Sequence, residues 1–243
     1  MFKILRNVIV AFTSGSKGGT GKSTLSVLTT ILLSAVLDGK KILLIDFGEH
    51  GNSTRMILKH PEPPFLTDFL KGNIKAIGRY RLKIGRIESK FFMIPNLGKI
   101  QKLSNIEIML KKISRIFDYI ICDLPAYQNS LYDCVIDLSD MVILVTLPNL
   151  VSIEAIKRAY TGKAKRVVVL NKYFKSAFQF KIELEKYFDE IVLTIPFDPY
   201  VSIMNANTLP IVLKKLSKNF QKHIADLCYV ISSYAMLKEA KIA

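Results

Sequence analysis

Several features that would assign the chain to a particular class of protein are missing from its sequence. Its three cysteines, Cys122, Cys134 and Cys228, are odd in number and lack metal-ligand spacing, so we expect buried, reduced thiols and a cytoplasmic protein. Apolar runs such as 27–37 are too short and too interrupted by Ser and Thr to span a bilayer. The first ten residues suit a strand better than a signal peptide. Repeats, low-complexity segments and a helix-turn-helix extension are also missing.

Acidic residues are scarce as well. The 243 residues include 20 Asp and Glu against 35 Lys and Arg, which gives a net charge of +15. A surplus of this size attracts polyanions, either nucleic acid or an acidic membrane surface, although generic solvation is the plainer alternative. Half of the residues are hydrophobic, so the chain can bury a sizeable core. We expect one domain over residues 1–243.

The stretch VIVAFTSGSKGGTGKSTL at 8–25 is the most informative part of the chain. Its β-favouring start, glycine-rich loop and following helical run are typical of a P-loop, whose glycines let backbone N–H groups approach a triphosphate. A glycine-rich turn that only joins a strand to a helix is the alternative. We expect Lys22 to neutralise the β and γ phosphate oxygens and the Ser23 hydroxyl to bind Mg²⁺. The predicted nucleotide-binding residues of this stretch are Lys17, Gly18, Gly19, Thr20, Gly21, Lys22, Ser23 and Thr24.

Apolar strands alternate with amphipathic helices over the whole length. This pattern predicts an α/β fold with a doubly wound, mainly parallel sheet flanked by helices, the P-loop NTPase fold, with the nucleotide at the carboxyl edge. Residues 72–90 read as irregular and basic, and are the best candidate for an inserted surface that contacts a partner. A long helix is expected at about 213–237, with an apolar stripe from Leu216 to Tyr234 facing the core.

Acidic residues close two of the buried strands. Asp46 follows the apolar run 42–45, and Asp123 ends the run FDYIICD. A carboxylate at this edge can reach Mg²⁺, usually through water, so we predict Ser23 and Asp123 as the metal site.

Five stretches, in this order, resemble the ParA/MinD family of deviant Walker A ATPases. KGGTGKST with Lys17 resembles the phosphate loop of that family, LLIDFGEHGNST its switch I, and DYIICDLPA its Walker B strand and switch II. VVVLNKY resembles the strand that ends in a base-contacting Asn, and IPFDPYVSIMNANTLPIV resembles the closing segment. The resemblance covers nearly the whole chain.

The resemblance implies an ATP- and Mg²⁺-dependent switch. In that family ATP binding drives a sandwich homodimer, in which Lys17 would reach the phosphates of the partner subunit. Asn171 would contact the adenine, together with the loop from Pro196 to Asp198. ATP-bound dimers would coat DNA non-specifically until an activating or cargo protein releases them, which would make the protein nucleoid-associated. A MinD-like ATPase positioned on a membrane is the alternative, although the tail KEAKIA shows no distinct basic amphipathic anchor.

Two motifs depart from the family pattern. Switch I usually reads D-x-D, and here Asp46 matches the first position while Gly48 takes the second and Glu49 follows. Tyr127 stands where switch II usually has a glycine. Lys17 and Asp46 are therefore the candidate catalytic residues of a slow or partner-dependent ATPase. A regulatory or scaffold protein that hardly hydrolyses ATP is a further alternative, and a metabolic ligase would need acid/base residues that the sequence does not supply.

Overall fold

The computed structural model describes residues 7–84, 87–103, 105–127 and 130–240, and eight strands in these ranges form one sheet. The strands are β1 (Val8–Thr13), β2 (Ile42–Asp46), β3 (Gly78–Ile84), β4 (Ile87–Ile94), β5 (Tyr119–Asp123), β6 (Met141–Thr146), β7 (Lys165–Tyr173) and β8 (Ile191–Pro196). Their order is β3-β4-β2-β5-β1-β6-β7-β8. All neighbours pair in parallel except β3 and β4, so the predicted fold class is confirmed.

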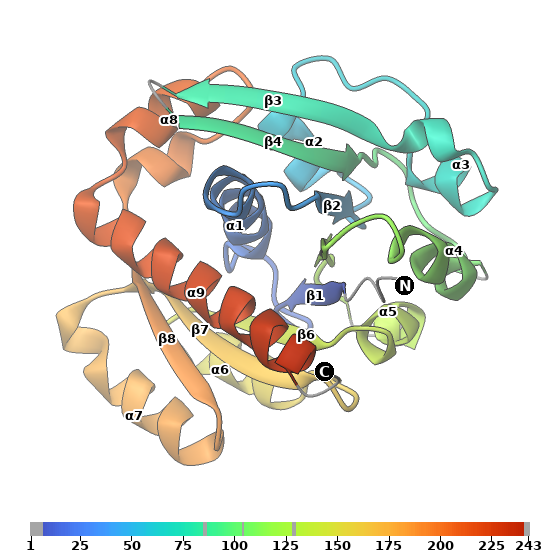
Figure 1. Ribbon diagram of the computed structural model, residues 1–243. Coiled ribbons are helices and arrows are strands. Elements are labelled where there is room, and N and C mark those ends of the chain that lie inside the picture. Colours follow the sequence, from blue (N-terminus) through green and yellow to red (C-terminus); the bar gives the residue numbers. More distant parts are fainter. Residues whose placement is uncertain (1–6, 85–86, 104, 128–129, 241–243) are drawn as a thin grey trace.

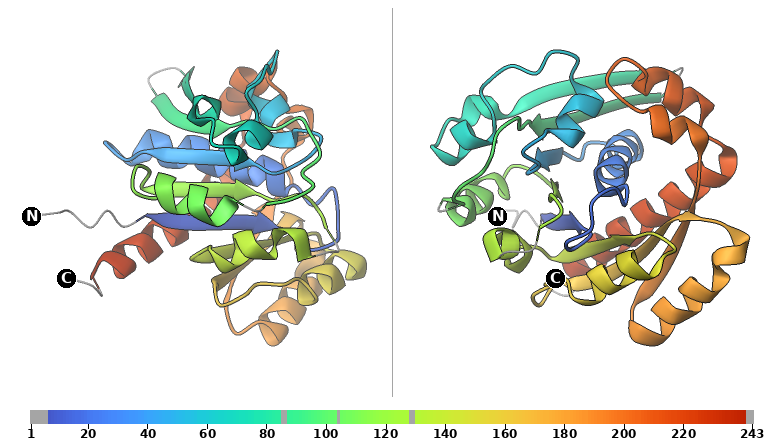
Figure 2. Two further views of the ribbon diagram at one scale, coloured as in Figure 1. Left: turned by 90° about the vertical axis from the view of Figure 1, so that its right-hand side faces the viewer. Right: turned by 180° about the vertical axis from the view of Figure 1, so that it is seen from behind.

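Helices cover both faces of this sheet (Figures 1 and 2). The α-helices are α1 (Lys22–Val36), α2 (Asn52–Ile57), α3 (Leu66–Leu70), α4 (Ile106–Ile113), α5 (Asp133–Asp137), α6 (Leu150–Lys157), α7 (Phe178–Tyr187), α8 (Leu209–Lys215) and α9 (Lys218–Ala240). Short 3-10 helices are η1 (Ile74–Ala76), η2 (Ser130–Tyr132), η3 (Lys175–Ala177) and η4 (Pro199–Ile203). Side chains of α1, α2, α8 and α9 pack on one face, and those of α3 to α7 on the other. The central strands β1, β2, β5 and β6 are buried on both faces, and they are apolar up to the polar residue that ends each of them.

The strand register brings the predicted site residues to one edge of the sheet. β2 and β5 pair so that Asp46 lies opposite Asp123, and β5 pairs with β1 so that Asp123 lies beside Phe12. Since these strands are parallel, all of their carboxyl ends meet where the phosphate loop leaves β1.

The prediction of an irregular segment at 72–90 is wrong from Gly78 onward. Residues 78–84 and 87–94 form the antiparallel β3–β4 pair at the edge of the sheet. Tyr80 and Leu82 pack inward against the core, and Arg81 between them is exposed, so the segment alternates as a half-buried edge strand does. Arg81 and Lys90 both pair with Glu88, which leaves the hairpin less positive than its arginines and lysines indicate.

The predicted helix at 213–237 is in fact two helices. α8 ends at Lys215, and α9 begins after Ser217, whose amide N donates to Asp198 Oδ2 at 2.8 Å and whose hydroxyl accepts from Phe220 N at 3.2 Å. Ser217 thus caps α9 as Ser commonly does at a helix start. The apolar stripe is confirmed, because Phe220, Ile224, Leu227 and Ile231 are buried and Leu216 and Tyr234 pack against the same core. The sequence interpretation assigned no helix to the segments that form α5 and α7.

Within the described residues, no helix has both the length and the apolar character needed to cross a membrane.

Candidate functional site

The phosphate loop occupies residues 14–21, between β1 and α1. Gly15, Gly19 and Gly21 have φ values of 56°, 76° and 92°, a left-handed conformation that favours glycine. A Cβ on Gly21 would lie 2.3 Å from Asn171 Nδ2, and one on Gly15 would lie 2.5 Å from the Ala155 carbonyl oxygen. A Cβ on Gly18 or Gly19 would meet no described atom within 4 Å. The loop is therefore packed tightly on its inner side and open along its outer rim.

Lys22 and Ser23 open α1 and are both buried, with Lys22 only 6% exposed. Burial lowers the pKa of the Lys22 ammonium, and the carboxylates of Asp123 and Asp46 raise it again. A buried ammonium at the start of a helix creates an anion site together with the free N–H groups of the first turn.

Asp123 faces this cation from the end of β5. Burial raises its pKa, while the Ser53 hydroxyl, the Lys22 charge and the Ser23 hydroxyl lower it. Ser53 Oγ donates to Asp123 Oδ2 at 2.5 Å, but the buried Oδ1 has no hydrogen-bond partner among the described residues. A buried acceptor without a donor is costly unless a ligand supplies the missing contact. The described residues contain no cluster of three or more His, Cys, Asp or Glu that could hold a metal ion. The Asp123 carboxylate and the Ser23 hydroxyl are oxygen ligands of the kind that Mg²⁺ takes together with water and phosphate.

The Asp46 carboxylate is hydrogen-bonded to the loop that follows it. Its Oδ2 accepts from Thr54 N and Thr54 Oγ1, each at 2.8 Å, and its Oδ1 accepts from Gly48 N at 2.8 Å. Burial and the neighbouring Asp123 raise the pKa of Asp46 to about 7. Both carboxylate oxygens thus hold the switch I loop in place, and the catalytic role that the sequence analysis gave Asp46 stays a prediction.

Asn96 and Thr54 complete the anchoring of switch I. Asn96 N donates to Thr54 Oγ1 at 2.9 Å, and Asn96 Nδ2 donates to the carbonyl oxygens of Gly48 and Gly98, each at 3.0 Å. The sequence analysis missed Ser53, Thr54 and Asn96. The motif GNST at 51–54 was a signal for the first two, but nothing in the sequence places Asn96 next to them.

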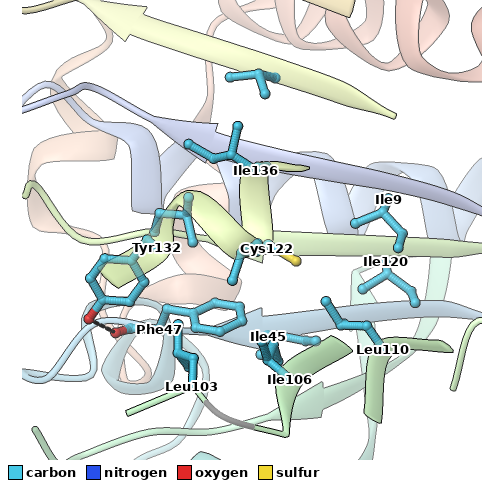
Figure 3. Close-up of a cluster of buried hydrophobic side chains, with 14 of the residues drawn as sticks. Ile9, Ile45, Phe47, Leu103, Ile106, Leu110, Ile120, Cys122, Tyr132 and Ile136 are labelled. Atoms are coloured by element: carbon cyan, nitrogen blue, oxygen red, sulfur yellow. Dashed lines mark hydrogen bonds between the residues drawn. The ribbon is translucent and has the colours of Figure 1, made fainter. Parts of the chain in front are cut away.

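Aromatic side chains connect switch II to switch I. The ring centroid of Tyr127 lies 5.1 Å from that of Tyr132, which lies 6.2 Å from that of Phe47. Figure 3 shows the Tyr132 hydroxyl directed at the Phe47 carbonyl oxygen, with 3.5 Å between the two oxygens. The backbone of Tyr127 also donates to the Gly15 carbonyl oxygen at 3.1 Å. The Glu49 side chain, by contrast, is 45% exposed, and its Oε1 lies 3.7 Å from His50 Nε2.

A pocket of about 280 Å³ opens beside the phosphate loop. The predicted binding residues among those lining it are Gly19, Gly21, Lys22, Ser23, Thr24, Asn171, Pro196 and Asp198. The structure therefore brings together two groups that are about 150 residues apart in the sequence. Met56, Phe197 and Phe220 also line the pocket and provide apolar surface.

Two of these residues also have structural contacts. Asn171 Nδ2 donates to the Thr20 carbonyl oxygen at 2.8 Å, which ties the phosphate loop to β7. Asp198 is buried, and its carboxylate accepts from Tyr200 N at 3.0 Å and from Ser217 N at 2.8 Å. The Asp198 side chain therefore holds η4 and the start of α9. Lys17 is half-buried and is not among the described residues that line the pocket.

Comparisons with known proteins concern the family and the fold of this chain. Residues 7–180 match the protein family described as AAA domain. The septum site-determining protein MinD of Helicobacter pylori (strain ATCC 700392 / 26695) is 25% identical over 177 residues. This match covers 68% of the chain and 65% of the relative, slightly less than two thirds of that protein.

Two solved structures show the same fold. The septum site-determining protein MinD from Pyrococcus horikoshii OT3, complexed with Mg-ADP, has a TM-score of 0.73 at 22% identity, over 96% of this chain and 98% of that one. A ParA family ATPase from Chlorobium tepidum TLS has a TM-score of 0.70 at 19% identity, over 92% of this chain and 99% of that one.

Proposed function

This chain belongs to the ParA/MinD family of P-loop ATPases, and from that membership we propose that it is an ATP-binding switch that positions DNA or another cargo. We treat residues 1–243 as one ATPase domain. The observation that carries the proposal is the buried pair of Lys22 and Asp123 beside the pocket that extends from the phosphate loop to Asn171. In this pair, Oδ1 of Asp123 has no hydrogen-bond partner among the described residues.

Each part of the nucleotide has a place in this arrangement. The N–H groups of the glycine-rich loop and the first turn of α1 receive the phosphates, and Lys22 neutralises their charge. Ser23 and Asp123 would hold Mg²⁺, which would offset the charge of the phosphate oxygens. Asn171 and the segment from Pro196 to Asp198 line the same pocket, and they would contact the adenine.

We further propose that ATP joins two copies of the chain through the outer rim of the loop. Gly18 and Gly19 leave that rim open, and Lys17 is partly exposed on it. Two facing nucleotides concentrate negative charge, which Lys17 of each copy offsets. Pairing two chains of net charge +15 multiplies their affinity for a polyanion, so the ATP-bound dimer binds DNA without sequence preference. A partner protein then triggers release.

Hydrolysis is the slow step of this cycle. Asp46 is fully engaged by Gly48 and Thr54, and Tyr127 packs into an aromatic cluster that restrains switch II. Water has to be positioned after switch I rearranges, with Asp46 and Lys17 as the candidate groups. The same two observations favour a second candidate function, a regulatory protein that uses ATP to hold a conformation and hardly turns it over.

The test combines nucleotide, dimer and DNA binding. We expect ATP to bind more tightly with Mg²⁺ than with EDTA, and to shift the chain from monomer to dimer in light scattering. Lys17→Ala should keep ATP binding and lose the dimer. Binding of any DNA duplex should need ATP and weaken steeply with salt.

Each possible failure has its own meaning. A chain that does not bind ATP contradicts the whole proposal, and DNA binding that ignores nucleotide contradicts the switch. If ATP-dependent binding is seen with anionic liposomes and not with DNA, the MinD-like alternative replaces the DNA-binding one. ATP-dependent dimers without measurable phosphate release favour the regulatory protein.

A further inference from the structure

An apolar groove of about 460 Å³ lies between α1 and the α8–α9 pair, on a different part of α1 from the nucleotide pocket. The α1 side of the groove consists of Leu28, Ile31, Leu32 and Ala35, which stand at i, i+3, i+4 and i+7 and so share one helix face. Leu213, Leu216 and Ile224 form the opposite side. Leu32, Leu213 and Leu216 are only partly buried, so part of this apolar surface remains open to a ligand.

Lysines border one side of this groove. Lys218 and Lys222 line it, and Lys214 and Lys215 lie at the end of the preceding helix. None of the four forms an ion pair with a side chain in the described part of the chain, whereas Arg166 pairs with Glu190. Their positive charge is thus left for a ligand, and it lies along the edge of an apolar floor.

The shape and the charge together restrict the class of ligand. The phosphates of DNA would pair with the lysines, but DNA has no apolar side chains that could cover the apolar floor of the groove. A bilayer surface takes up protruding apolar side chains, whereas this surface is concave. An amphipathic helix places apolar side chains at i, i+3, i+4 and i+7 into such grooves, and acidic residues on its flank would meet the lysines.

We propose that this groove is a docking site for an acidic amphipathic helix of a partner protein. The helix inserts its apolar face between α1 and α9, and its carboxylates pair with Lys218 and Lys222. Because α1 begins at Lys22 of the phosphate loop, the docked helix contacts the element that also holds the nucleotide. The groove and the nucleotide pocket share no described lining residue, so docking can be tested separately from the proposed ATP switch.

The test uses a synthetic probe and the intact chain, without nucleotide. The probe is a fluorescein-labelled peptide with leucines at i, i+3, i+4 and i+7 and glutamates on the flanks. A scrambled peptide of the same composition is its control. Binding is followed by fluorescence anisotropy. One variant, Ala225→Glu, places a carboxylate at an exposed position that lines the groove, and a second, Lys218→Glu with Lys222→Glu, reverses the charge at its border. Lys163→Glu with Lys186→Glu, at two exposed lysines outside the groove, is the matched control.

We expect the chain to bind the probe and not the scrambled peptide. Ala225→Glu and the Lys218/Lys222 double variant should each weaken binding by about tenfold or more, and the Lys163/Lys186 variant by less than about twofold. ATP affinity should be the same in all variants, which separates this result from a failure of the proposed function. Absence of probe binding, equal binding of the scrambled peptide, or equal loss in the control variant would overturn the proposal. It would also be overturned if anionic vesicles or DNA displaced the probe and Ala225→Glu had no effect on its binding.

Discussion

Alanine substitutions along the phosphate loop can separate backbone strain from steric contact, because three of its glycines differ in only these respects. Gly18 has no positive φ, and a Cβ there would meet no described atom within 4 Å. Gly19 has a φ of 76° and the same open surroundings. Gly21 has a φ of 92°, and its Cβ would lie 2.3 Å from Asn171 Nδ2. The series Gly18→Ala, Gly19→Ala, Gly21→Ala therefore adds strain first and a clash second.

The expected changes in the free energy of unfolding follow from these differences. Gly18→Ala should stabilise the chain by up to about 1 kcal/mol, because alanine restricts the unfolded state. Gly19→Ala places a side chain in the left-handed region, at a cost of about 1–2 kcal/mol. Gly21→Ala adds the loss of the hydrogen bond from Asn171 to the Thr20 carbonyl, about 0.5–1.5 kcal/mol, for a total of roughly 1.5–3.5 kcal/mol. In a chain of this size that total lowers the melting temperature by roughly 3–14 °C.

The assay is urea unfolding followed by circular dichroism, without nucleotide, so that ligand binding does not enter the comparison. If Gly21→Ala proves as stable as Gly18→Ala, the tight inner packing of the loop is refuted. Equal destabilisation in Gly19→Ala and Gly21→Ala would leave the strain argument intact and refute the contribution of the Asn171 contact.

Three further predictions concern switch I, switch II and the metal site. Tyr127→Gly removes the ring that packs on Tyr132, so phosphate release from ATP should rise several-fold. Tyr127→Phe keeps the ring and should change phosphate release little. A fall in both variants would contradict the restraint of switch II by this ring. Burial and Asp123 raise the pKa of Asp46 from 3.8 to about 7, so the folded chain keeps a proton that the unfolded chain has lost. The free energy of unfolding should therefore fall as the pH rises from about 5 to about 7, and this fall should be smaller in Asp46→Asn; parallel curves would contradict the raised pKa. Asp123→Asn should reduce the gain in ATP affinity that Mg²⁺ provides by about 10-fold or more, measured by titration with and without EDTA, and an unchanged gain would place the metal elsewhere.

The sequence predicted most of the fold because its central strands are continuous apolar runs. The runs at 42–45 and 117–123 place β2 and β5 within a residue or two of their observed bounds. The edge strand β3 was missed, because only one of its faces is buried and its arginines and lysines hide the alternation. The break between α8 and α9 was missed because it depends on the contact between Ser217 and Asp198, 19 residues apart.

The sequence by itself determined the phosphate loop, the two acidic strand ends and the family to which the chain belongs. These are local patterns, in which a glycine or a carboxylate at one position is required by its immediate neighbours. The tertiary structure alone decided what those groups contact. It placed Asn171 against Thr20, tied Asp46 to Thr54 and Gly48, and left one oxygen of Asp123 without a described partner. Such contacts depend on strand register and helix packing across the sheet, which no local stretch of the sequence encodes.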